Sequence, residues 1–89
     1  MKLFMVHVGF YDQSIGEGIY ETHLNYFIVA LNAKDAKTKT QNLEEFKAKS
    51  MHIDGIKEIN NVEGYEVILK ETDTDLEGEI LSYDEAKEL

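Results

Sequence analysis

Four stretches of this chain divide into two alternating faces of distinct character or into two apolar faces, and a fifth follows a helical period. Alternation with a period of two is typical of β-strands, because successive side chains point to opposite faces of a sheet. It predicts strands at residues 2–8, 21–31, 51–59 and 65–71. Gly9 is expected to end the first strand, and residues 10–20, which contain Gly16 and Gly18, are expected to form a long loop.

The helical period covers residues 33–49. Asn32 stands where a cap for the first turn is needed, and Asp35 places a negative charge near the positive end of the helix dipole. One stripe of this helix carries its apolar or small residues, namely Ala33, Ala36, Thr40, Leu43 and Phe46. The helix is therefore expected to cover one face of a sheet, and its lysines are interpreted as a solvated surface.

The order strand, strand, helix, strand, strand predicts an α+β fold: an approximately four-stranded, mainly antiparallel sheet with one helix on one face. Apolar residues on both faces of the first strand favour a central position for it. Residues 60–64 are a turn that would join the last two strands into a hairpin. Residues 1–71 form the predicted domain, and residues 72–89 form an acidic tail.

The tail carries two weaker signals. Residues 79–81 could add a short edge strand, and Ser82 and Glu85 have the spacing of a capping box at the start of a helical turn. One helix leaves the second face of the sheet uncovered, so either the tail or a second subunit is expected to cover it. A symmetric homodimer is the preferred arrangement.

Charge and composition exclude several classes of function. The formal net charge is -9, and the chain has no arginine, which argues against a nucleic-acid partner. It has no cysteine, which excludes disulfides, thiolate chemistry and Cys-ligated metals. No apolar run is long enough to span a membrane, and the N-terminal residues do not resemble a signal peptide. A cytoplasmic location is therefore expected.

Four residues are the main candidates for chemistry: Glu21 and His23 in the second predicted strand, and His52 and Asp54 in the third. Each pair has the i, i+2 spacing that points both side chains to one face of a strand. If the two strands are neighbours, two imidazoles and two carboxylates would converge, which suits a divalent metal or an acid–base pair. The alternative is that both histidines are structural.

The tail contains a second candidate. Counted from Asp73, acidic residues fall at positions 1, 3, 5 and 12 of a loop with glycine at position 6, which approaches the pattern of an EF-hand calcium loop. The candidate ligands are Asp73, Asp75, Glu77 and Asp84. The preceding segment is predicted as a strand rather than a helix, so a solvated acidic turn is the alternative.

Several of these motifs occur together in a known family. In chain order they are the opening strand Leu3–Gly9, Glu21-Thr22-His23, His52-Ile53-Asp54-Gly55 and Val62-Glu63-Gly64-Tyr65. Together they resemble one unit of the bacterial domain-of-unknown-function family 1543. The resemblance covers residues 2 to about 70. Longer members contain two such units, which implies that two copies of this chain could associate. The resemblance implies no activity.

The chain is thus expected to be a small, acidic, cytoplasmic α+β protein that acts as a homodimeric binding or interaction module. A metal-assisted or acid–base enzyme that uses Glu21, His23, His52 and Asp54 is the first alternative, and calcium binding in residues 73–84 is the second. The sequence identifies no cofactor and no small-molecule ligand.

Overall fold

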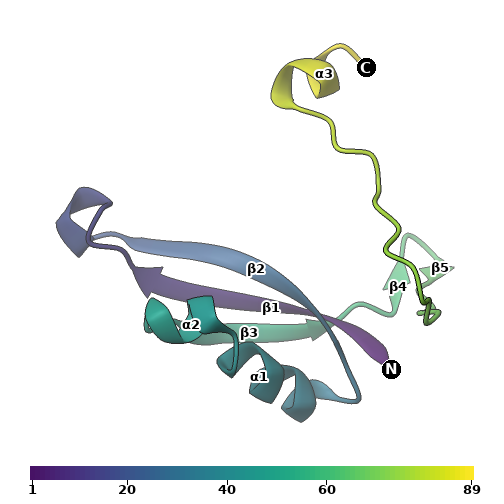
Figure 1. Ribbon diagram of the computed structural model, residues 1–89, viewed down its shortest axis with the longest axis horizontal. Helices are drawn as coiled ribbons and strands as arrows, with labels where there is room; N and C mark the ends of the chain where they lie inside the picture. The colour runs from purple at the N-terminus through teal and green to yellow at the C-terminus, as the bar shows by residue number, and fades with distance from the viewer.

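A computed structural model describes residues 1–89 and shows one three-stranded antiparallel sheet with helices on one face (Figure 1). The strands are β1 (Lys2–Tyr11), β2 (Glu21–Ala30) and β3 (His52–Glu58), in the order β2-β1-β3. A single 3-10 turn, η1 (Gly16–Gly18), lies in the connection between β1 and β2. The α+β class and the central position of the first strand are therefore confirmed.

The predicted single helix is in fact two. α1 (Ala33–Gln41) begins at Asn32, whose side chain accepts a hydrogen bond from the Asp35 amide at 2.8 Å, so the predicted cap is confirmed. α2 (Glu44–Ala48) follows after Leu43, whose extended backbone (φ -66°, ψ 136°) interrupts the helix. Threonine side chains that bond to the backbone one turn earlier weaken a helix, and the hydroxyls of Thr38 and Thr40 bond in this way to the carbonyls of Lys34 and Ala36.

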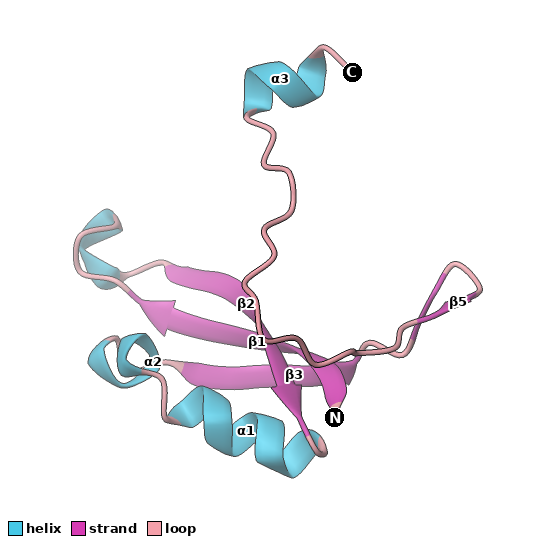
Figure 2. Ribbon diagram, turned by 45° about the vertical axis from the view of Figure 1, so that its right-hand side comes forward, coloured by secondary structure: helices cyan, strands magenta, loops and turns pink.

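The hydrophobic core lies between the sheet and these helices. Phe4, Val6, Val8 and Phe10 alternate along β1 on the helix-covered face, and none is more than 4% exposed. Ala30, Ala36 and Met51 complete the buried set. No helix covers the opposite face of the sheet, which we call the open face (Figures 1 and 2).

The prediction of a fourth strand in the sheet is wrong. Residues 65–71 contribute only the two-residue β5 (Tyr65–Glu66), which pairs with β4 (Asn61–Val62) in a separate hairpin that projects from the sheet (Figure 2). Glu63 and Gly64 form its turn with positive φ angles of 53° and 84°. Alternation marks a segment that could be a strand, but pairing needs a neighbour, and β3 pairs only with β1.

The first strand also differs from its prediction, because it runs through Gly9 to Tyr11. Gly9 pairs with His23 of β2 and with His52 of β3. A glycine keeps its backbone donor and acceptor, so it can sit inside a sheet where a side chain would not fit. The second and third strands agree with their predictions within one residue at each end.

The C-terminal segment leaves the sheet and extends away from it (Figures 1 and 2). Residues 79–81 form no strand, but the predicted helical turn is present as α3 (Tyr83–Lys87). Its capping box is complete, since Ser82 accepts from the Glu85 amide and Glu85 accepts from the Ser82 amide. No helix has both the length and the hydropathy that crossing a membrane requires.

Candidate functional site: a histidine–carboxylate cluster on the open face

The end of β1 and the starts of β2 and β3 lie together at one end of the sheet, beside η1 (Figure 1). Glu21 and His23 open β2, and His52 and Asp54 open β3. Both strands pair with β1, so Gly9 lies between His23 and His52 in one row across the sheet. The side chains of Glu21, His23, His52 and Asp54 meet there on the open face, and we call them the histidine–carboxylate cluster.

Each imidazole of the cluster faces both carboxylates. His52 Nε2 lies 2.9 Å from Glu21 Oε1 and 3.1 Å from Asp54 Oδ1. His23 Nε2 lies 3.1 Å from the same Glu21 oxygen and 3.3 Å from Asp54 Oδ2. Glu21 therefore offers one oxygen to both rings, while Asp54 offers a different oxygen to each.

Gly9 makes this convergence possible. A Cβ atom built on Gly9 would fall 2.8 Å from Asp54 Oδ2, 2.8 Å from His52 Nε2 and closer still to Glu21 Oε1. Such separations are too short for a real Cβ, so any other amino acid at position 9 would push the cluster apart. The four side chains of the cluster therefore pack directly over the backbone of Gly9.

A third histidine adjoins the cluster. The His7 ring is stacked on the His23 ring, with centroids 5.0 Å apart and an angle of 7° between the ring planes. His7 Nδ1 lies 2.7 Å from Asn25 Oδ1, on the residue directly opposite it in β2. The chain has three histidines in all, so every imidazole of the protein is at this end of the sheet.

A β-bulge positions Asp54. Val8 pairs with Ile53 and His7 pairs with Gly55, which leaves Asp54 as the extra residue of β3. Bulges are frequent next to active sites, because they re-aim a side chain without ending the strand. Here the bulge places the Asp54 carboxylate between the ring of His23 and the ring of His52.

The site is open to solvent. The exposed fraction of its side chains runs from 31% for Glu21 to 48% for His52. Neutral imidazoles and ionised carboxylates are the usual nitrogen and oxygen ligands of divalent metals. Two groups of residues have potential ligand atoms that all lie within 4.8 Å of one another inside the group. One group is His7, His23 and Asp54, and the other is Glu21, His52 and Asp54.

All four main candidates from the sequence are thus in one place, with imidazole-to-carboxylate distances of 3.3 Å or less. The tail candidates are not. Asp73, Asp75 and Glu77 lie in the irregular segment before α3, Asp84 lies in its first turn, and no group of potential ligand atoms includes any of them. Calcium binding in the tail stays a prediction.

Sequence reasoning missed His7, Gly9 and Asn25. Alternation along residues 2–8 puts His7 on the same face as Leu3 and Met5. It does not give the register between β1 and β2. Once His7 is known to pair with Asn25, and Gly9 with His23, the role of all three follows.

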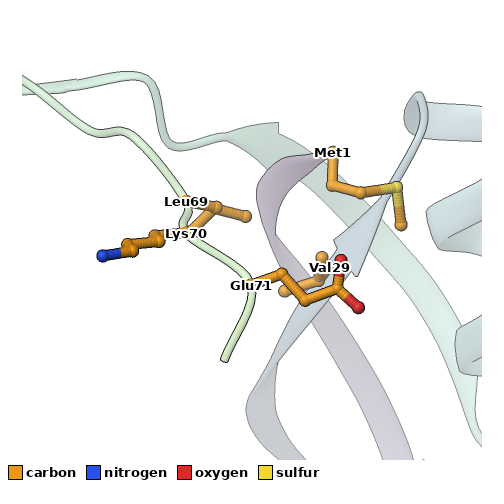
Figure 3. A pocket seen from close by; sticks show the side chains of 5 residues that line it. All are labelled: Met1, Val29, Leu69, Lys70 and Glu71. Carbon is orange, nitrogen blue, oxygen red and sulfur yellow. The ribbon is translucent and has the colours of Figure 1, made fainter. Parts of the chain in front are cut away.

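The other end of the open face is apolar. Phe27 is 65% exposed, Val29 44% and Leu31 65%, and Met5 and Leu3 lie beside them on β1. A pocket at this end is lined by Met1 and Val29 and by residues 69–71 of the segment that follows β5 (Figure 3). None of the cluster residues lines this pocket or the neighbouring one around Met1, Leu3 and Glu58.

Comparison with known proteins gives one match. Residues 19–69 match the model of a family described as Domain of Unknown Function (DUF1543). This stretch contains both motifs of the cluster and begins after β1. No curated protein and no solved structure matches the chain.

Proposed function

Because the chain belongs to the DUF1543 family, whose description assigns no activity, we propose a function from the site itself: a binding module for a divalent first-row transition metal ion, held by Glu21, His23, His52 and Asp54. The observation that carries this proposal is that Nε2 of His23 and Nε2 of His52 each lie 2.9 to 3.3 Å from an oxygen of both carboxylates.

These separations match the spacing of ligands around one ion. For metal–ligand bonds of about 2.1 Å, adjacent ligand atoms lie about 3.0 Å apart in square or octahedral geometry and about 3.4 Å apart in a tetrahedron. Without a cation, the Glu21 and Asp54 carboxylates face the same point on the open face, where their charges repel. A cation at that point removes the repulsion and binds both rings.

Composition favours the same class of ligand. The formal net charge of -9 attracts cations and repels anionic substrates. Imidazole with carboxylate suits zinc, nickel, cobalt or iron(II), while the absence of cysteine disfavours copper(I) and iron–sulfur clusters.

The test is metal analysis of the untagged protein, followed by titration of metal-free protein with Zn²⁺. Replacing a direct ligand should weaken binding by at least about 100-fold, because ligand-supporting residues alone account for about 10- to 100-fold. His52→Ala is the variant, and Glu66→Gln, on the separate hairpin, is the control that should bind normally. Equal affinities for His52→Ala and the unaltered protein would refute the proposal.

An acid–base or metal-assisted enzyme at the same four residues is the alternative that shares this geometry. The solvent-exposed cluster leaves coordination positions for water, as catalytic metal sites do. The two pockets beside Met1 include none of these four residues. Metal binding needs only the imidazole and carboxylate contacts described above, so binding is the better-supported role.

A second candidate function is assembly through the apolar end of the open face, with a second copy of the chain as the partner. Phe27 and Val29 are each at least 44% exposed and pair with Met5 and Leu3 of β1, and the exposed Leu31 follows directly after β2. A contiguous apolar patch is rarely left in water, and a patch on a two-fold axis can pack on itself. Longer members of the resembled family contain two such units in one chain, and a pair of single-unit chains would reproduce that arrangement.

Light scattering at tens of micromolar tests this assembly. The unaltered chain should show the mass of two chains, while Phe27→Asp should show the mass of one, because a charge would be buried in the interface. Tyr65→Asp, at an exposed position on the hairpin outside the sheet, should remain dimeric. A monomer mass for the unaltered chain would exclude the homodimer.

Two further predictions are separable from these. Calcium at Asp73, Asp75, Glu77 and Asp84 predicts a saturable change in the tail's NMR signals on addition of Ca²⁺, and unchanged signals would exclude it.

The cytoplasmic location predicts recovery of the protein in the cytoplasmic fraction of its source cells.

A further inference from the structure

His7 meets the cluster through the face of its ring. The rings of His7 and His23 are stacked, with centroids 5.0 Å apart and an angle of 7° between their planes. The lone pair of an imidazole nitrogen lies in the plane of the ring, so two nearly parallel rings cannot direct their lone pairs at one ion. The close group of ligand atoms from His7, His23 and Asp54 therefore reflects stacking and not a shared ion.

The register of β1 and β2 explains how the two rings meet. His7 pairs with Asn25 and Gly9 pairs with His23, so His7 and His23 are diagonal neighbours on adjacent strands. Diagonal neighbours on one face of an antiparallel pair lie about 7–8 Å apart, which is within the reach of aromatic side chains. Strand pairing by itself thus brings the ring of His7 to one face of the ring of His23.

Asn25 holds the ring of His7 in this orientation. His7 Nδ1 lies 2.7 Å from Asn25 Oδ1. Because an amide oxygen can only accept a hydrogen bond, the proton is on Nδ1, and the bond fixes both the tautomer and the ring plane of His7. His7 is also half-buried, whereas all four residues of the cluster are exposed.

The ring of His23 needs such a restraint, because its side chain is 42% exposed. The torsion that turns an imidazole has broad minima, so an exposed ring can rotate and carry its nitrogens away from an ion. Both polar contacts of His23 are made by Nε2, while the stack with His7 holds the face of the ring. Supporting groups outside the coordination shell are usual for metal-bound histidines, and their loss costs about 10- to 100-fold in affinity.

We propose that His7 is a positioning residue of the metal site: it binds no ion itself, and it orients His23 toward the ion by stacking on it. Asn25 fixes the ring of His7 for this role. The inference rests on the metal-binding function proposed above. The order of action is from Asn25 to His7, from His7 to His23, and from His23 to the ion.

Titration of the full-length, untagged, metal-free protein with Zn²⁺ compares two substitutions of His7. His7→Ala removes the ring and should weaken binding by about 10-fold without changing the number of ions bound. His7→Phe has no ring nitrogen but keeps a flat ring that can stack on His23, so it should recover most of that loss. Equal affinities for the two variants, whether reduced or unchanged, would overturn the proposal.

The unaltered protein separates this proposal from the function on which it rests. If it binds no Zn²⁺, both fail; if it binds Zn²⁺ and the two His7 variants do not differ, only the role of His7 fails. Tyr65→Ala is the control for loss of a ring, because it removes an exposed ring from the separate hairpin and should bind normally.

A double substitution tests the role of Asn25. Asn25→Ala alone should weaken Zn²⁺ binding by no more than His7→Ala does, because the ring of His7 loses its anchor and keeps its place in the strand. Added to His7→Ala, the same substitution should have no further effect, since Asn25 acts only through His7. Additive losses would contradict this order of action.

Nitrogen NMR of the unaltered protein keeps the proposal falsifiable if a variant fails to fold. On addition of Zn²⁺, the Nε2 signals of His23 and His52 should shift strongly, and the signals of both ring nitrogens of His7 should change little. A nitrogen of His7 that shifts as strongly as Nε2 of His23 would identify His7 as a ligand and overturn the proposal.

Discussion

The two faces of the sheet show different uses of the same strands. On the helix-covered face, Phe4, Val6, Val8 and Phe10 are at most 4% exposed. On the open face, the same strand presents Leu3, Met5, His7 and Gly9 to a surface with no helix over it. Burial of the first set supplies the stability of the domain, so the second set is free to carry chemistry at one end and an apolar surface at the other.

The largest difference between the faces should be in stability. Phe4→Ala removes a ring that is 3% exposed, while Phe27→Ala removes one that is 65% exposed on the neighbouring strand. The first should lower the free energy of unfolding by about 3–5 kcal/mol, and the second by less than about 1 kcal/mol in the monomer. Urea unfolding measures both.

A domain of this size can be close to unfolding after such a loss. Phe4→Leu is the milder variant, and it should lie between the two alanine variants. Equal losses for Phe4→Ala and Phe27→Ala would show that the open face is covered in solution, which would point to the proposed dimer.

Gly9→Ala tests whether metal binding on the open face can be weakened without lowering the stability that the covered face supplies. The three atoms nearest the added Cβ belong to the side chains of Glu21, His52 and Asp54, which can move away. Affinity for Zn²⁺ should therefore fall by about 10- to 100-fold with little change in unfolding free energy. Calorimetric titration and urea unfolding of the same sample measure the two quantities.

A matched control is available at another glycine. A Cβ on Gly55 would meet nothing within 4 Å, although Gly55 lies in the bulge next to Asp54. Gly55→Ala should keep Zn²⁺ affinity within a few-fold. Unchanged affinity in Gly9→Ala would mean that ions bind elsewhere than over the central strand.

The smallest predicted effect concerns pH and the covered face. Burial, and then a hydrogen bond from the Tyr26 hydroxyl to Glu45, raise the pKa of Tyr26 from 10.0 to about 12. Because the folded state favours the protonated phenol, this contribution to stability is complete below pH 10 and is lost as the pH rises toward 12. Tyr26→Phe should flatten the decline in unfolding free energy between pH 10 and 12.

At neutral pH the same substitution should cost no more than about 1 kcal/mol, since the bond partner Glu45 is exposed and stays hydrated. Urea unfolding at pH 8 and pH 11 separates the two effects. An identical slope with pH in the variant and the unaltered protein would rule out Tyr26 as its source.

Local rules explain which parts of this structure were predictable. Asn32 and Ser82 cap helices through bonds to residues three positions away, so sequence spacing is sufficient to identify them. Alternation likewise identified β1, β2 and β3 within a few residues. It failed for residues 67–71, because the same alternation does not specify a partner strand.

The candidate site divides in the same way. The i, i+2 pairs Glu21–His23 and His52–Asp54 were visible in the sequence because strand alternation alone puts each pair on one face. That both pairs meet over Gly9, with His7 beside them, depends on β1 lying between β2 and β3 and on the register of both ladders. The sequence by itself determined which residues could be ligands. Only the tertiary structure decided that they converge, since convergence depends on pairings between residues that are far apart along the chain.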